Sequence, residues 1–170
     1  MCGIFGILYK DGSRETDAAR LQESARRIAH RGPDATGVFS EPGIGLAHTR
    51  LSLLDLDERS DQPMWDAQRR YCVVFNGEIY NFRDLREELA ERQIEFNTTS
   101  DTEVLLQCLM VLGVETTLER LRGMFAFAFY DRQQRTVTLA RDRFGIKPLH
   151  IYQDDEKLIF ASEVKSMMPW

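Results

Sequence analysis

The chain of 170 residues carries 22 Lys and Arg against 27 Asp and Glu, which gives a formal net charge of −5 at pH 7. This acidic balance argues against a mainly electrostatic binder of nucleic acid. No apolar run approaches the roughly 20 residues of a membrane-spanning helix, and the first residues lack the pattern of a secretory signal. Composition therefore predicts an acidic globular domain of the cytoplasm, with neither membrane nor nucleic acid as a partner.

In the first half of the chain, the hydrophobic pattern predicts several short strands and one helix. Strands are expected at residues 4–9, 37–40, 44–50 and 71–75. A helix is expected at 17–30, where Leu21, Ala25 and Ile28 are spaced i, i+4 and i+7. Residues 62–70 are interpreted as an exposed loop. The Asn-Gly pair that follows Phe75 is expected to end the last of these strands.

In the second half, the pattern predicts helices followed by strands that are separated by short turns, as in β-hairpins. Helices are expected at 81–92, behind Ser100 and at 114–122, strands at 124–130, 136–141, 149–153 and 158–161, and the start of a helix at 162–168. Ser100 and Glu103 have the spacing of a capping box. The strand 124–130 is apolar on both faces, which is typical of a strand covered on both sides. This mixture predicts an α+β fold of mainly antiparallel sheet packed by helices.

The three cysteines, Cys2, Cys72 and Cys108, are far apart and form no CxxC pair. They predict neither a disulfide framework nor a zinc site, and the scattered histidines predict no other metal site. Cys72 and Cys108 lie in apolar patterns and are expected to be buried.

Cys2 is a candidate nucleophile. Removal of Met1 would leave Cys2 with both a thiol and a free α-amine, whose reference pKa is near 8. The amine would then serve as the general base for the thiol of the same residue. Gly3 and Gly6, in a strand-like run, indicate that this end of the chain approaches something closely.

Four further residues are candidates for binding the substrate and stabilising its reaction with such a nucleophile. The Asn76 side chain and the Gly77 N–H would stabilise an oxyanion, although an ordinary Asn-Gly turn is an alternative. Arg50, at a strand end, would grip a carboxylate, and Asp101 would bind an ammonium or simply complement its helix dipole. Together they suit a substrate with an α-carboxylate, an α-ammonium and a reactive amide, and glutamine has all three.

Six ordered motifs carry a resemblance to the class II glutamine amidotransferase domain, most like that of glutamine-hydrolysing asparagine synthetases. The motifs are Met1-Cys2-Gly3-Ile4-Phe5-Gly6, Arg31-Gly32-Pro33-Asp34, His48-Thr49-Arg50-Leu51-Ser52, Phe75-Asn76-Gly77-Glu78-Ile79-Tyr80-Asn81, Ser100-Asp101-Thr102-Glu103 and Arg141-Asp142-Arg143-Phe144-Gly145-Ile146-Lys147-Pro148-Leu149. The resemblance implies an N-terminal-nucleophile hydrolase fold, an αββα sandwich of two antiparallel sheets between helix layers.

The resemblance also implies roles for residues. Cys2 would be the nucleophile and Asn76 and Gly77 the oxyanion hole, and the residues that bind glutamine would be Arg50, Leu51, Asn76, Gly77, Glu78 and Asp101. The motif at 31–34 would shape the rim of the site or form a rigid turn. The motif at 141–149 is expected to fix a loop between strands rather than to touch glutamine.

The same resemblance sets the expected context of this domain. Residues 1–170 would form the glutaminase domain, ending before its last strands, with no cofactor and no metal of its own. ATP and Mg²⁺ would belong to a synthetase domain that these residues lack, and that domain or subunit would accept the ammonia. Three alternatives remain: a noncatalytic module that senses glutamine or docks on a partner, an amidotransferase half serving another acceptor, and an N-terminal-nucleophile peptidase or amidase.

Overall fold

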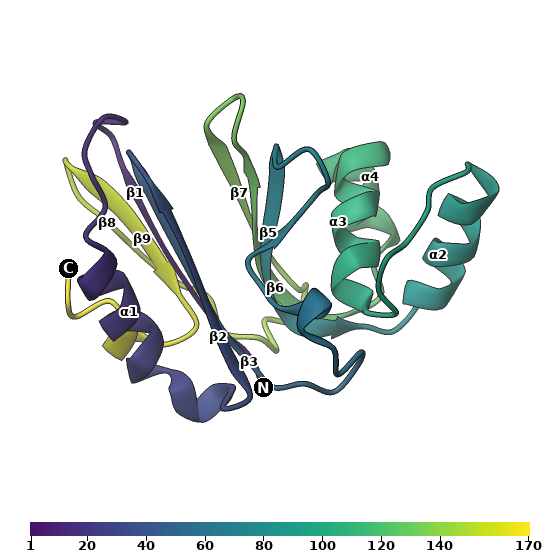
Figure 1. The fold of residues 1–170 in the computed structure, drawn as a ribbon, viewed down its shortest axis with the longest axis horizontal. Coiled ribbons are helices and arrows are strands. Elements are labelled where there is room, and N and C mark those ends of the chain that lie inside the picture. Colours follow the sequence, from purple (N-terminus) through teal and green to yellow (C-terminus); the bar gives the residue numbers. More distant parts are fainter.

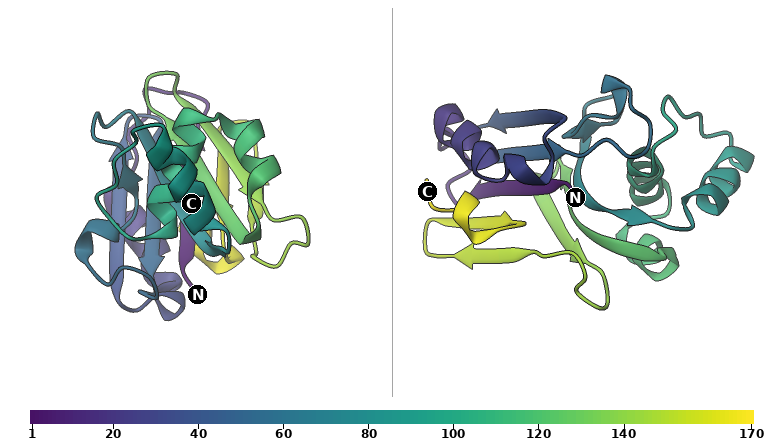
Figure 2. Two further views of the ribbon diagram at one scale, coloured as in Figure 1. Left: turned by 90° about the vertical axis from the view of Figure 1, so that its right-hand side faces the viewer. Right: turned by 90° about the horizontal axis from the view of Figure 1, so that it is seen from below.

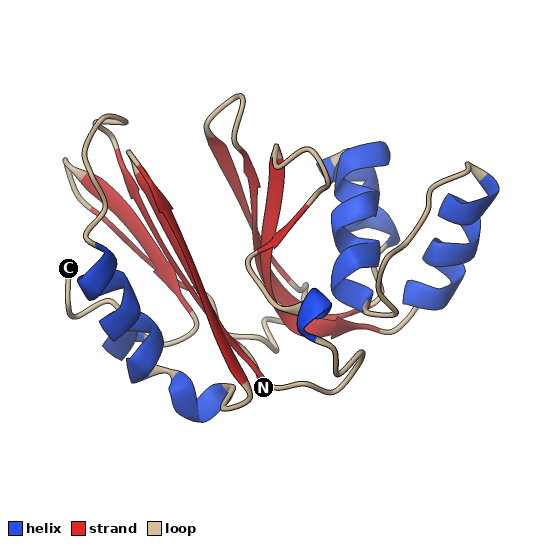
Figure 3. Cartoon of the chain, in the orientation of Figure 1, coloured by secondary structure: helices blue, strands red, loops and turns tan.

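The structure is a computed structural model that describes residues 1–170, and it has four layers (Figures 1 and 3). One sheet has the strand order β2-β3-β1-β9-β8 and the other the order β4-β5-β6-β7, and all pairings are antiparallel. The strands are β1 (Gly3–Tyr9), β2 (Ala35–Glu41), β3 (Ile44–Arg50), β4 (Met64–Trp65), β5 (Tyr71–Ile79), β6 (Gly123–Asp131), β7 (Thr136–Arg141), β8 (His150–Gln153) and β9 (Lys157–Ala161).

Helices cover the outer faces of the two sheets. Helix α1 (Ala18–Arg27) packs on the five-stranded sheet, and α2 (Phe82–Glu91), α3 (Asp101–Val111) and α4 (Val114–Arg120) lie outside the four-stranded sheet. The teal and green helices α2 to α4 lie toward the viewer in the left view of Figure 2 and toward the right in the other view. The predicted αββα sandwich of two antiparallel sheets between helix layers is confirmed.

Strand periodicity decides which side chains fill each layer. In β1, Ile4 faces the space between the sheets while Phe5 and Ile7 pack against α1, as successive side chains of a strand point to opposite faces. In β6 the same rule sends Phe127 toward the helices and Ala128 toward the other sheet. Both faces of this strand are buried, as its apolar sequence predicts.

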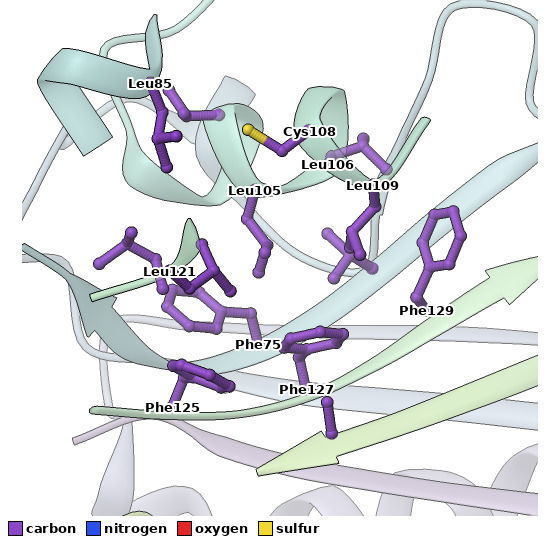
Figure 4. Packing of buried hydrophobic residues seen from close by; sticks show 14 of the residues in the cluster. Phe75, Leu85, Leu105, Leu106, Cys108, Leu109, Leu121, Phe125, Phe127 and Phe129 are labelled. Atoms are coloured by element: carbon purple, nitrogen blue, oxygen red, sulfur yellow. The ribbon is translucent and has the colours of Figure 1, made fainter. Parts of the chain in front are cut away.

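The largest of the three apolar clusters lies between the four-stranded sheet and its helices (Figure 4). Leu105 and Leu109 point from α3 toward Phe75, Phe127 and Phe129 of the sheet. Cys108 belongs to this cluster, and Cys72 lies in the cluster between the sheets, so both are buried as predicted.

Gly3 and Gly6 were expected to let this end of the chain approach something closely, and what lies close to them is side chains of the protein itself. A Cβ on Gly6 would stand 2.1 Å from the Phe160 ring, and one on Gly3 would stand 2.6 Å from Thr49 Oγ1. The absent side chains therefore leave room for neighbours within the fold.

Two predictions about local structure were wrong. Residues 62–70 are not simply an exposed loop, because they contain β4 and bury Gln62, Met64 and Asp66. Only a 3₁₀ turn (Val164–Ser166) forms in place of the helix that was expected to begin at 162–168. Both errors arise because tertiary packing decides short segments that have little periodicity of their own.

The predicted capping box at α3 forms in part. The Ser100 hydroxyl accepts a hydrogen bond from the Glu103 N–H at 3.3 Å. The Glu103 carboxylate does not return to Ser100, and instead accepts from the N–H groups of Asn97 and Thr98 at 2.9 and 2.7 Å. It thereby fixes the segment that leads into α3.

No helix of the structure is both long enough and apolar enough to cross a bilayer.

Leu105→Ala tests the helix-side core. Leu105 is 1% exposed, so its truncation should lower the free energy of unfolding by about 2–5 kcal/mol through lost burial and the cavity left behind. Urea unfolding followed by circular dichroism measures this change. Leu56→Ala is the control, because Leu56 is 77% exposed and should contribute little. Equal unfolding midpoints for the two variants would contradict the packing described here.

Candidate active site

All seven residues predicted to act on a substrate line one cavity of about 320 Å³. They are Cys2, Arg50, Leu51, Asn76, Gly77, Glu78 and Asp101. Cavities that bind small molecules have volumes of this order. The cavity includes Met1 and therefore lies where the N-terminus meets the two sheets, which are close together at this end of the molecule (Figure 1).

Cys2 immediately precedes β1, and the pairing of Gly3 with Thr49 brings it beside the end of β3. The Leu51 N–H donates to Cys2 Sγ at 3.4 Å, and the thiol lies 3.7 Å from the Leu51 carbonyl oxygen. The Cys2 carbonyl accepts a hydrogen bond from Arg31 Nε at 2.9 Å. These contacts fix both the backbone and the sulfur of Cys2.

The surroundings of the Cys2 thiol act on its pKa in opposite directions. Burial raises the pKa, while the Leu51 N–H, the N-terminal ammonium and Arg50 lower it, and the net direction is upward. An unassisted thiol here would therefore be mostly protonated at neutral pH. Forming the thiolate requires a base that takes the proton or a cation that stabilises the charge.

The Asn-Gly pair does not form the turn that the sequence favoured as an alternative. Strand β5 continues through it to Ile79, with Asn76 opposite Ala126 and Gly77 opposite Phe125. Gly77 is required by this pairing, because a Cβ there would stand 2.3 Å from the Met124 carbonyl oxygen. The local turn preference of Asn-Gly is overridden by the neighbouring strand.

The outer edge of β5 presents its backbone to the cavity. Alternate residues of an antiparallel strand direct their N–H and C=O groups to opposite sides. The Phe75 N–H donates to Gln62 Oε1 at 2.6 Å, and the Ile79 N–H donates to Asp101 Oδ2 at 3.0 Å. Gly77 lies midway between them, so its N–H points toward the same edge, into the cavity.

The Asn76 side chain is buried beside this edge, with 1% of its surface exposed. Neither its Nδ2 nor its Oδ1 has a hydrogen-bond partner in the protein. A buried amide without partners costs free energy, so such groups are rare in folded proteins and call for an explanation. A ligand oxygen bound in the cavity would accept from Nδ2 and relieve part of this cost.

His48 joins the two sheets next to the Asn-Gly pair. Its Nε2 lies 3.1 Å from the Phe75 carbonyl oxygen, which assigns the proton to Nε2 and leaves Nδ1 buried without a partner. Burial, assisted by the nearby Arg50, lowers the pKa of His48 to about 3, against the weaker upward effect of the hydrogen bond to Phe75. His48 is therefore neutral and holds β5 against β3.

Arg50 also shapes the wall of the cavity. Its Nη1 donates to the Asp57 carbonyl at 2.9 Å and pairs with Asp61 at 2.7 Å, while its Nη2 donates to the carbonyls of Leu54 and Asp55. One side chain thereby ties down the loop between β3 and β4.

Two carboxylates also line the cavity. Glu78 extends from β5 and is exposed, whereas Asp101, the first residue of α3, is buried. Burial, with a smaller contribution from the negative charge of Glu78, raises the pKa of Asp101 to about 6 despite its hydrogen bond from the Ile79 N–H. The two carboxylates suit a ligand cation.

The motif at 31–34 supports this site through hydrogen bonds to Cys2 and Ser52. Arg31 holds the Cys2 carbonyl and pairs with Glu163 at 3.0 Å, and the Asp34 carboxylate accepts from the Ser52 N–H at 2.7 Å. No three His, Cys, Asp or Glu side chains are grouped so that they could hold a metal ion.

Three contributors to this site could not be recognised from the sequence: Gln62 and Lys147, which line the cavity, and His48, which joins the two sheets beside it. Gln62 was assigned to an exposed loop, and His48 was noticed only as part of a motif. Lys147 was assigned to a loop between strands, yet its side chain lines the cavity. No periodicity marks any of these positions, because each acts through a contact distant in sequence.

His48→Gln tests the joint between the sheets through pH. The pKa of His48 is near 3 in the folded protein and about 6.5 in an unfolded chain, so the unfolded state binds the extra proton between these values. The free energy of unfolding should therefore decrease as pH falls below about 6.5. The amide of Gln does not titrate, so the variant should lack this part of the decrease.

Urea unfolding of both proteins from about pH 7 to about pH 4.5 measures the difference, in which the contributions of all other groups cancel. A constant gap between the two free energies over this range would contradict a neutral, buried His48.

Comparison with known proteins identifies the family. A protein family described as "Glutamine amidotransferase domain" matches residues 1–170. Glutamine-hydrolyzing asparagine synthetase 1 of Bacillus subtilis (strain 168) is 41% identical over 170 residues, which are 99% of this chain and 27% of that protein. Glutamine-hydrolyzing asparagine synthetase B of Escherichia coli (strain K12) is 40% identical over 174 residues, covering 99% of this chain and 30% of that protein.

A solved structure agrees with this fold. Glutamine phosphoribosylpyrophosphate amidotransferase from B. subtilis superposes with a TM-score of 0.78 at 21% identity, over 98% of this chain and 43% of that one. The chain thus spans less than a third of the length of the two synthetases and less than half of the solved chain. It belongs to the glutamine amidotransferase domain family and has the fold of the N-terminal-nucleophile hydrolases.

Proposed function

We propose that this chain hydrolyses the side-chain amide of glutamine, with Cys2 as the nucleophile once Met1 has been removed. The observation that carries the proposal is the unpartnered Asn76 amide, buried in the same cavity as the Cys2 thiol. A donor held ready without a partner is what the oxyanion of an acyl transfer needs. The family of the chain supports the same reaction.

The first half of the reaction would form a thioester. The α-amine of Cys2 takes the thiol proton, and the sulfur adds to the side-chain carbonyl carbon of glutamine. The carbonyl oxygen becomes an oxyanion, which accepts from Asn76 Nδ2 and the Gly77 N–H. As this intermediate collapses, the carbon–nitrogen bond breaks and the α-ammonium returns its proton to the leaving group. Ammonia departs and a γ-glutamyl thioester remains on Cys2.

The second half would release glutamate by the same groups. Water adds to the thioester carbonyl while the α-amine of Cys2 takes its proton, and the oxyanion forms again at the same two donors. The carbon–sulfur bond then breaks, and the sulfur recovers a proton from the α-ammonium. The sum is glutamine plus water giving glutamate plus ammonia, and Cys2 ends as it began.

Substrate recognition follows from the charges of the cavity. Arg50, which is paired with Asp61 in the free site, would bind the α-carboxylate, and Glu78 and Asp101 would share the α-ammonium. The Leu51 backbone would contact glutamine beside the thiol, although its N–H is bonded to Cys2 Sγ in the free site. These charges would orient the side-chain amide of glutamine toward Cys2.

In a longer protein, the ammonia would serve ATP-dependent synthesis of asparagine from aspartate. The two asparagine synthetases to which the chain is similar support this acceptor. ATP and Mg²⁺ would then be bound by the synthetase domain or subunit and not by the residues described here. A cytoplasmic location fits the three free thiols, since cytosolic cysteines are kept reduced.

Asn76→Ala tests the oxyanion donor. Glutamate release should fall by about 100- to 1,000-fold, mainly in kcat, because the lost hydrogen bond forms in the transition state. Coupled detection of glutamate measures it, with Cys2→Ala as the inactive reference and the exposed Asn97→Ala as the matched control. An Asn76→Ala variant as fast as the wild type would contradict the assignment. Absence of glutamate release from a folded, Met1-processed wild type would instead favour a glutamine-binding module.

The raised pKa of Asp101 predicts how glutamine binding depends on pH. Below about pH 6 the carboxyl becomes protonated and loses its attraction for the α-ammonium, so the binding constant should fall with decreasing pH, by at most about tenfold per unit. Calorimetric titration of a Cys2→Ala chain with glutamine avoids turnover during the measurement. Asp101→Asn in the same background should bind more weakly and lose this pH dependence. An equally steep fall in both proteins would assign the effect to another group.

A further inference from the structure

Lys147 lies in the loop between β7 and β8, and hydrogen bonds to Arg141 and Asp142 fix this loop. The Asp142 carboxylate accepts from the N–H groups of Phe125, Phe144, Ile146 and Lys147. Arg141 donates to the carbonyls of Gly145 and Lys147 at 2.6 and 2.7 Å. The backbone of Lys147 is thereby held from both its N–H and its C=O.

The Lys147 side chain is buried in the cavity that contains Cys2, with 5% of its surface exposed. Its backbone carries all of its hydrogen bonds, and its ammonium enters none of the ion pairs of the protein. Arg50, the other basic side chain of the cavity, is paired with Asp61. Lys147 is therefore the basic side chain of this cavity whose charge is not neutralised by an ion pair.

An uncompensated ammonium in a buried position is costly unless an anionic partner arises there. The pKa of Lys147 is lowered by burial and by Arg31, and held up by Cys2, Glu78 and Asp142. Asp142 already accepts four N–H groups, which outweigh its burial and lower its own pKa. Of these three anionic groups, the thiolate of Cys2 is the one that the reaction creates.

Arg50 lowers the pKa of the Cys2 thiol, but burial outweighs it and the net direction is upward. Arg31 holds the Cys2 carbonyl, but its charge is already paired with Glu163. The Asp101 carboxylate opposes the thiolate. A further cation in the cavity would offset both the burial of the thiol and this repulsion.

We propose that Lys147 acts through Cys2: its ammonium favours the thiolate of Cys2 and the unprotonated form of the Cys2 α-amine. The same charge assists both the nucleophile and the base, because a cation stabilises the thiolate anion and disfavours the protonated, cationic form of the amine. This inference rests on the proposed function of Cys2 and adds a residue that the reaction scheme does not otherwise use.

The test measures the thiol directly and needs no glutamine turnover. In chains shown by intact mass to lack Met1, the rate of Cys2 alkylation by iodoacetamide is followed against pH. Alkylation of a Cys2→Ala chain gives the background, and Cys72 and Cys108 are fully buried. The readout therefore decides the role of Lys147 even if the wild type fails to hydrolyse glutamine.

Lys147→Met should move the midpoint of the alkylation profile upward by about one pH unit, because the favourable charge is lost. Lys147→Arg keeps the charge and should stay near the wild type, and Lys10→Met, an exposed site beyond the far end of β1, should leave the profile unchanged. Lys147→Gln serves as a second neutral variant should the Met variant fail to fold. A folded neutral variant with the midpoint of the wild type would overturn the proposal.

Discussion

The site depends on how closely two separate sheets are held at one end of the sandwich. Cys2 immediately precedes β1 of the five-stranded sheet, whereas Asn76 and Gly77 belong to the four-stranded sheet. A nucleophile and its oxyanion donors must converge on one carbonyl group. The hydrogen bond between His48 and the Phe75 carbonyl spans the two sheets beside these residues. Because His48 stays neutral when buried, this joint adds no charge to the cavity and holds over a wide range of pH.

The second constraint is the unpaired edge of β5. An exposed strand edge normally has to be covered, and here Gln62 covers it on one side of the Asn-Gly pair while Asp101 covers it on the other. Between these two side chains the Asn76 amide has no protein partner, and the Gly77 N–H lies at the same edge, beside the cavity. The proposed oxyanion hole thus lies where this strand edge is left uncovered, between two residues whose N–H groups are hydrogen-bonded. This explains why an Asn-Gly pair stands inside a strand.

Much of the fold could be predicted from periodicity and turn chemistry, and the candidate site from the chemistry of a few residues. The strand 4–9, the helix beginning near Asp17 and the doubly buried strand 124–130 all have patterns that local sequence determines. The continuation of β5 through Asn76 and Gly77 could not be predicted, because pairing with β6 overrides a local turn preference. Gln62 and Lys147 reach the cavity only through tertiary contacts, so no spacing in the sequence marks them.

In the proposed mechanism Cys2 supplies both the nucleophile and the base, and blocking its α-amine tests this most directly. A chain carrying a cleavable peptide ahead of Cys2 has the same thiol, the same Asn76 and the same fold, but no free amine at Cys2. Glutamate release would be measured on one preparation before and after the peptide is removed, with intact mass confirming each form. We expect release only after removal. Equal rates before and after removal would show that another group is the base.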